Sequence, residues 1–262
     1  MENISQELKS LKDLWVCSCK SLDAELIGSL HLEQLHWNSD SLRSKTFIQM
    51  ISGSPQLKVL RIGRGKVCFD LFKLASTQLE EIRELYVTCE LLVDSKPVVH
   101  FKNLTKLVLY YPKLKPSHFK CIGNISTLKF LQCVHPVTWD DFKNICQGQL
   151  IHLDTLIFDR CGLSDQHMTL LQQANLPSLT SLDMKYDYIF DDGVFAISQS
   201  NLKKLRFISL SDSASHVAVI ALLERLDELI EIELQKMLKK VVNLKKVQKA
   251  CQQLNKKVKY RQ

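Results

Sequence analysis

Two pairs of adjacent carboxylates stand out in the sequence, Asp140–Asp141 and Asp191–Asp192. Two carboxyl groups held together can act as a general acid and base, or can bind a hard metal ion. Each pair, however, falls where a helical pattern begins, and a carboxylate at that place is stabilised by the positive end of the helix dipole. The sequence therefore favours helix capping for both pairs.

Cysteine and histidine spacing gives no metal or redox site. Cys17 and Cys19 form a single C-x-C pair, which supplies too few ligands, and His31 and His36 are five residues apart with no cysteine at ligand spacing. None of the common catalytic or phosphate-binding motifs occurs. We expect a protein that is not an enzyme and that carries no catalytic residue, metal or cofactor.

Composition places the chain among globular proteins of reducing compartments. It has 262 residues, 45% of them apolar, which is enough for a packed core. Nine cysteines without a C-x-x-C pair indicate reduced thiols, and therefore the cytoplasm or the nucleus. No apolar run is long enough to cross a membrane, and the N-terminal residues lack the apolar segment of a signal peptide.

The chain repeats the template L-x-x-L-x-L, with other apolar residues allowed at the leucine positions. Neighbouring matches are 21 to 26 residues apart, and they begin at Leu11, Leu32, Leu57, Ile82, Leu104, Leu128, Leu153, Leu179, Leu205 and Leu229. This period and template are typical of leucine-rich repeats, in which each unit supplies a short strand and a returning helix. We predict an α/β solenoid of about ten repeats in a single domain, residues 1–262. It should form a horseshoe with a curved parallel sheet on the concave face and helices on the convex face.

Cys161 stands eight residues after the first leucine of its template, where the chain leaves the strand. A small side chain that can form hydrogen bonds is needed there to serve buried main-chain groups. The segments LDTLIFDRCGLSDQHMTLL and DYIFDDGVFAIS resemble the cysteine-containing subclass of leucine-rich repeats. That subclass is found in F-box leucine-rich-repeat proteins and in ribonuclease-inhibitor-like horseshoes. Because the first repeat begins by residue 11, we expect no F-box in this chain.

The outward positions of the central strands are unusually apolar for a solvated sheet face. They form a predicted concave patch on neighbouring strands, made of Tyr86, Val108, Tyr110, Phe130 and Ile157. An exposed aromatic and apolar patch edged by charge is typical of a protein-binding surface. Two alternatives remain at this point: a loop of the same chain could cover the patch, or an error of register could turn these residues to the other face.

The tail from residue 236 to 262 holds ten Lys or Arg residues and no acid, which leaves 25 basic against 28 acidic residues in the rest of the chain. Apolar residues recur there every three or four positions through Val258, which predicts a basic amphipathic helix that caps the solenoid over residues 235–262. A secondary basic patch is predicted at Lys239, Lys240, Lys245, Lys246, Lys249, Lys256 and Lys257.

Two functions of different class follow. The first is a monomeric protein-interaction module that binds a protein on its concave face, and the family resemblance implies that it is the substrate-recognition part of an F-box-type ubiquitin ligase adaptor with ligase subunits as partners. The second is a nuclear or RNA-associated scaffold that binds nucleic acid through the basic tail. Mixed charge around the patch favours the first, because nucleic acid requires a continuous basic stripe.

Overall fold

The computed structural model describes residues 10–17, 30–38, 51–67, 79–91, 101–110, 114, 116–211, 213–235 and 243–261. The chain divides into two compact units, unit 1 at residues 1–128 and unit 2 at residues 129–262.

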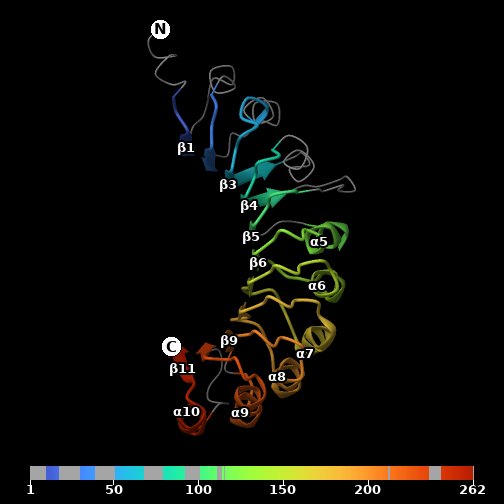
Figure 1. Cartoon of the computed structure of the whole chain (residues 1–262), viewed down its shortest axis with the longest axis vertical. Coiled ribbons are helices and arrows are strands. Elements are labelled where there is room, and N and C mark those ends of the chain that lie inside the picture. Colours follow the sequence, from blue (N-terminus) through green and yellow to red (C-terminus); the bar gives the residue numbers. More distant parts are fainter. Residues whose placement is uncertain are drawn as a thin grey trace. The chain divides into compact units, whose positions relative to one another are not determined.

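Unit 1 is built on five parallel strands that lie side by side in chain order (Figure 1). They are β1 (Asp13–Cys17), β2 (Gln34–Asn38), β3 (Val59–Val67), β4 (Glu84–Leu91) and β5 (Lys106–Tyr110). Helix α5 (Pro116–Gly123) follows β5. Equivalent repeat positions pair across the strands, so that Leu35 of β2 is opposite Leu60 of β3 and Leu60 is opposite Leu85 of β4. The predicted register is confirmed in this unit.

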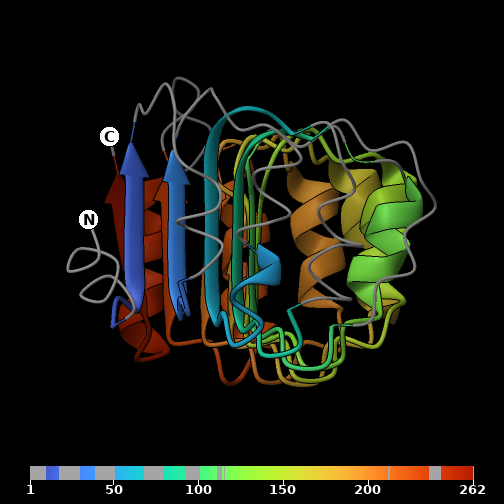
Figure 2. The same cartoon turned by 90° about the horizontal axis from the view of Figure 1, so that it is seen from above.

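Unit 2 alternates strands and helices, and its strands are again parallel and in chain order. The strands are β6 (Phe130–Val134), β7 (Thr155–Phe158), β8 (Ser181–Asp183), β9 (Phe207–Ser211), β10 (Glu231–Gln235) and β11 (Lys257–Arg261). The helices are α6 (Trp139–Cys146), α7 (Asp165–Thr169) followed by the 3₁₀ turn η1 (Leu170–Gln173), α8 (Asp191–Ser198), α9 (His216–Arg225) and α10 (Leu244–Gln253). These helices lie on one side of the strands, each beside the next (Figures 1 and 2).

The core of each unit consists of the template residues. Every first-position residue from Leu32 to Leu229 is at most 1% exposed. Strand residues alternate in the same way: Leu156 and Phe158 are fully buried, while Thr155 and Ile157 lie half-buried on the opposite face. We call the face that carries Thr155, Ile157 and their equivalents the outward face.

In three neighbouring repeats of unit 2, a polar side chain at one repeat position holds the turn after the strand. Cys161 Sγ donates to the carbonyl oxygen of Cys133, as the sequence predicted for this cysteine. In the next repeat Asp187 has the same place, and its Oδ1 accepts from the main-chain N–H of Leu163 at 3.0 Å. One repeat later, Ser213 contacts Ser211 Oγ, which donates to the carbonyl oxygen of Asp187 at 2.6 Å. The position thus connects neighbouring repeats. Cys19, the other predicted turn cysteine, lies outside the described residues.

Carboxylates at the helix starts have structural partners. Thr138 and Asp141 form a reciprocal capping box at the start of α6, with Thr138 N donating to Asp141 Oδ2 at 3.0 Å. Asp191 accepts from the main-chain N–H of Ser215 in the following repeat. The expected structural role is therefore confirmed for Asp141, whereas Asp191 joins two repeats and the N-cap of α8 is Phe190.

The basic tail differs from the predicted helix. Helix α10 ends at Gln253, and residues 257–261 form β11, parallel to β10. Asn255 adopts a left-handed backbone with φ of 53°, and the N–H of Lys256 donates to the carbonyl oxygen of Cys251. This is a Schellman ending, which asparagine tolerates well and which stops the helix before Val258. The prediction of a helix through Val258 is wrong, because that residue belongs to a strand.

Candidate functional site

A row of side chains crosses the outward face of unit 1 at the centres of its strands. In-register pairing places Trp15, His36, Arg61, Tyr86 and Val108 on β1 to β5 in that order. Trp15 is 67% exposed, and its ring stacks on the ring of His36 with centroids 3.8 Å apart and an interplanar angle of 15°. The indole therefore offers its other face to solvent.

Arg61 and Tyr86 form the second half of this row. The Arg61 guanidinium carbon lies 4.3 Å from the centre of the Tyr86 ring, a cation–π contact, and Lys106 Nζ lies 5.4 Å from the same ring. Tyr86 Oη donates to Glu84 Oε2 at 2.8 Å, which fixes the direction of the ring. The Tyr86 ring therefore packs against one face of the Arg61 guanidinium.

A hollow of about 270 Å³ lies over this row and the adjacent row of the same face. It is lined by Trp15, Cys17, His36, Trp37, Asn38, Arg61, Ile62, Gly63, Tyr86 and Thr88. A Cβ atom at Gly63 would lie 2.9 Å from Asn38 Oδ1 and 3.1 Å from Thr88 Oγ1. The side chains of Asn38 and Thr88 thus approach the main chain at residue 63 more closely than a Cβ atom would allow, and this close approach requires glycine at the edge of the hollow.

Three polar atoms of residues that line the hollow, His36 Nε2, Trp37 Nε1 and Arg61 Nε, lack hydrogen-bond partners among the described residues. His36 is 8% exposed. Burial, and secondly the charge of Arg61, lowers the pKa of His36. A buried polar group without a partner is costly, so these atoms favour a ligand that brings hydrogen-bonding oxygens.

The predicted concave patch is divided between the two units. Tyr86 and Val108 are paired in register on β4 and β5, and Tyr110 is the last residue of β5. Phe130 starts β6, and Ile157 on β7 is in register with Gln132. The tyrosines, Phe130 and Ile157 are all partly exposed. Val108 is only 3% exposed, so its expected accessibility is wrong.

Sequence reasoning left Trp15, His36 and Arg61 out of the patch. All three have the same place in the repeat template as Tyr86, four residues after the first template position, so the template also places them outward. A tryptophan at such a solvated strand position was itself a signal. The close approach of Asn38 and Thr88 to Gly63 could not be predicted, because it requires knowledge of the neighbouring strands.

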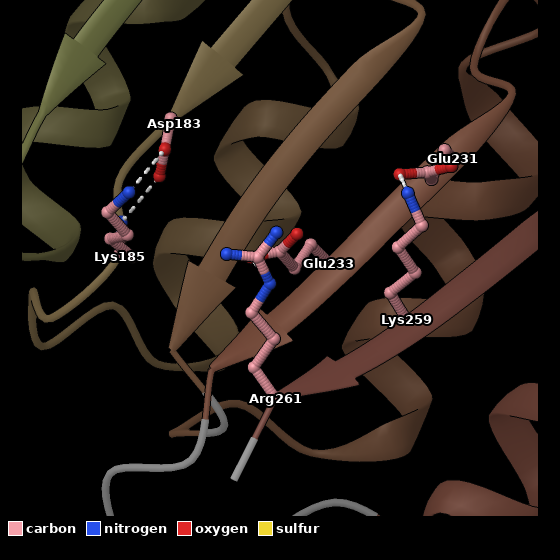
Figure 3. A network of polar contacts seen from close by, with 6 residues as sticks. All are labelled: Asp183, Lys185, Glu231, Glu233, Lys259 and Arg261. Atoms are coloured by element: carbon pink, nitrogen blue, oxygen red, sulfur yellow. Dashed lines mark hydrogen bonds and ion pairs between the residues drawn. The ribbon is translucent and has the colours of Figure 1, made fainter.

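The basic tail is partly used inside the protein. Lys256 Nζ donates to the carbonyl oxygens of Leu223 and Leu226 at 2.7 and 2.6 Å, at the carboxyl end of α9. On β11, Lys259 pairs with Glu231 at 2.7 Å and Arg261 with Glu233 at 3.0 Å (Figure 3). These contacts neutralise the acidic residues of β10 that face them.

The remaining predicted basic residues are spread over two elements. Lys245, Lys246 and Lys249 are exposed on α10, and Lys257 is exposed on β11. Lys239 and Lys240 lie outside the described residues.

Neither a metal centre nor a membrane span is found where the structure is described. No group of three or more His, Cys, Asp or Glu residues in the described ranges could hold a metal ion. None of the helices among those residues is long and apolar enough to cross a membrane.

Comparisons with known proteins give structural likenesses only. No protein-family model matches the sequence, and no curated protein matches it. The chain is similar to one in the crystal structure of the Rad7 and Elc1 complex in yeast, at 15% identity and a TM-score of 0.44, covering 93% of this chain and 84% of that one. It is also similar to a protein from Bacteroides fragilis, at 15% identity and a TM-score of 0.41, covering 97% of this chain and 66% of that one. Likenesses at this level carry no argument about partner or activity.

Proposed function

We propose that this chain is a leucine-rich-repeat solenoid of about ten repeats that acts as a protein-interaction module, with a protein partner bound on the outward face of its strands. The observation that carries the proposal is the hollow on unit 1, with Trp15 exposed at its edge. In a horseshoe this outward face is the concave one, where the repeat architecture presents ordered rows of side chains.

The residue types at the hollow are those that dominate protein interfaces. Trp, Tyr and Arg are enriched among interface residues whose truncation costs the most binding free energy, and Trp15, Tyr86 and Arg61 lie in one row. Their stacking limits the rotamers of each side chain before a partner arrives. Less conformational entropy is then lost on binding.

The hollow is large enough to receive an anchoring side chain of a protein partner. Pockets for small molecules and cofactors usually enclose about 300–1,000 Å³. At about 270 Å³ this hollow is close to the lower end of that range. It suits one anchoring side chain, with the surrounding face supplying the rest of the interface.

The role of a substrate-recognition part of an F-box-type ubiquitin ligase adaptor, in the cytoplasm or nucleus, is the narrower form of this proposal. It rests on the resemblance of the repeats around Cys161. Its specific expectation is that ligase subunits accompany the partner when the chain is isolated from cells.

Binding of nucleic acid through the tail is the weaker candidate. Lys256, Lys259 and Arg261 already have partners within unit 2. The exposed lysines of α10 are few compared with the continuous basic surface that phosphate binding requires. Tail-driven binding would also decrease steeply with salt.

The test is capture of partners from cell extract by the full chain at moderate and high salt. Trp15→Ala and Tyr86→Ala should each weaken binding of a captured protein by about tenfold or more, as expected for central interface aromatics. Trp139→Ala is the matched control, because Trp139 is an exposed tryptophan at the start of α6. Partners that ignore both hollow variants and dissociate at high salt would contradict the proposal.

A further inference from the structure

The charge of the hollow indicates what kind of side chain it receives, if the proposed function holds. Among its lining residues in the described part of the chain, Arg61 is the one residue that is charged at neutral pH. No acidic side chain of the described residues lines the hollow. An anionic group is therefore the complementary occupant.

Arg61 is held in position but its donors are not saturated. Its plane is supported by the Tyr86 ring, and Nη2 lies 3.8 Å from Glu84 Oε2, which is too far for a good hydrogen bond. Glu84 Oε2 instead accepts from Tyr86 Oη. A guanidinium with free donors in a fixed plane matches the two oxygens of a carboxylate.

His36 supplies a second unpaired nitrogen next to Arg61. The two residues are in register on β2 and β3, and His36 Nε2 is buried without a partner in the described residues. Trp15 stacks on the same imidazole ring, so the ring is held in place from the side of β1. A carboxylate oxygen between the two side chains would provide the missing partner of the imidazole.

Space for such a group exists beside these donors. The hollow encloses about 270 Å³, and next to Arg61 it is bordered by Asn38 and Thr88, whose polar side-chain atoms lie close to the main chain at Gly63. The hollow therefore combines donors, a cation and an aromatic wall in a volume suited to one residue.

We propose that the hollow binds the carboxylate of an Asp or Glu side chain of the protein partner, with Arg61 and His36 as its donors and Trp15 packed against its aliphatic part. The partner thus presents an acidic residue flanked by groups that contact the aromatic row. This inference rests on the proposed function and specifies the chemistry of the same site.

The test uses a displayed library of random dodecapeptides selected on the full chain. Selected peptides should be enriched in Asp or Glu at one position. Synthetic versions with that residue changed to Asn or Gln should bind about tenfold more weakly or worse, as expected for loss of a charge-assisted pair. Arg61→Gln should give a similar loss, and Arg83→Gln, an exposed arginine outside the hollow, should leave binding unchanged.

Each outcome distinguishes this inference from the function on which it rests. Peptides that need Trp15 and Tyr86 but bind equally well with amide in place of acid would overturn the carboxylate inference and leave the interaction module standing. Peptides indifferent to all residues of the hollow would overturn both. The acid-to-amide comparison on the unmodified chain decides the matter even if Arg61→Gln does not fold.

Discussion

The Cys161 thiol donates a hydrogen bond to the main-chain carbonyl oxygen of Cys133, 3.2 Å away and 28 residues earlier in the chain. Burial raises the pKa of this thiol to about 12, so the proton needed for the bond is retained at neutral pH. The contact links the turn after β7 to the strand of the preceding repeat. The cysteine is therefore a structural donor and not a reactive thiol.

Removal of this donor should destabilise the protein. We expect Cys161→Ala to lower the free energy of unfolding by about 1–2 kcal/mol, because a buried hydrogen bond and some packing are lost. Cys161→Ser keeps a hydroxyl donor and should lose less. Urea unfolding of both variants measures this, with Cys17→Ala as an exposed control. Equal losses for Ala and Ser would mean that packing of the sulfur, and not the hydrogen bond, decides the effect.

Asp187 should make stability depend on pH. Burial raises the pKa of its carboxyl from 3.8 to about 7, although main-chain N–H groups of residues 161–163 oppose this shift. Since the folded state then holds a proton that the unfolded state has lost, the stability contributed by this group falls as pH rises from about 4 to about 7.

Asp187→Asn should remove that dependence. Its Oδ1 can still accept from Leu163 N, and no charge is buried at high pH. Denaturation midpoints between pH 5 and pH 8 should fall for the unmodified protein relative to Asp187→Asn. Asp192→Asn, an exposed carboxylate in the next helix, is the control. Parallel curves for the two proteins would contradict the prediction.

The repeat register could be predicted because it depends on a local rule. Apolar residues such as Leu60 and Leu85 recur at fixed template positions, and alternation along each strand then decides which side chains are buried. The hydrogen-bonding role of Cys161 could be predicted for the same reason, because this residue has a fixed place after the strand template. The structure of the basic tail was not predictable in this way, because the position of Val258 fits the spacing of apolar residues in a helix and in a strand equally well. The left-handed backbone of Asn255 ends the helix before that residue, and the presence of an asparagine in the sequence is not enough to predict that conformation.

The candidate site was only partly predictable because it depends on contacts between strands. Alternation placed Tyr86 and Val108 on the outward face, yet Val108 is buried by its surroundings. The stacking of Trp15 on His36 and the close approach of Asn38 and Thr88 to Gly63 involve residues more than twenty positions apart in sequence. A single sequence therefore predicts which residues lie on the outward face, but not which of them are buried or where that face is hollowed.

Lys256 should contribute to stability and not to nucleic-acid binding. Its ammonium group donates to the carbonyl oxygens of Leu223 and Leu226 at the end of α9, where helix carbonyl groups need hydrogen-bond donors from outside the helix; Leu226 O also accepts from Leu229 N. Lys256→Met keeps the aliphatic chain but should lower the free energy of unfolding by about 1–2 kcal/mol. Lys257→Met, at an exposed position on β11, should change it by less than about 0.5 kcal/mol. Thermal and urea unfolding compare the two, and equal effects would contradict the capping role.

The ion pairs of β11 give the last prediction. The side chain of Glu233 is only 6% exposed, whereas that of Glu231 is 19% exposed. Loss of Arg261, the partner of Glu233, should therefore destabilise the protein more than loss of Lys259, the partner of Glu231. We expect Arg261→Ala to lower the free energy of unfolding by about 1–2 kcal/mol and Lys259→Ala by less than about 1 kcal/mol. With Glu233→Gln already present, Arg261→Ala should cost clearly less, and a double-mutant cycle measures this coupling. A coupling energy of zero would mean that Arg261 does not stabilise β10. Arg261 would then be free to bind an acidic ligand, as the alternative function of the basic tail requires.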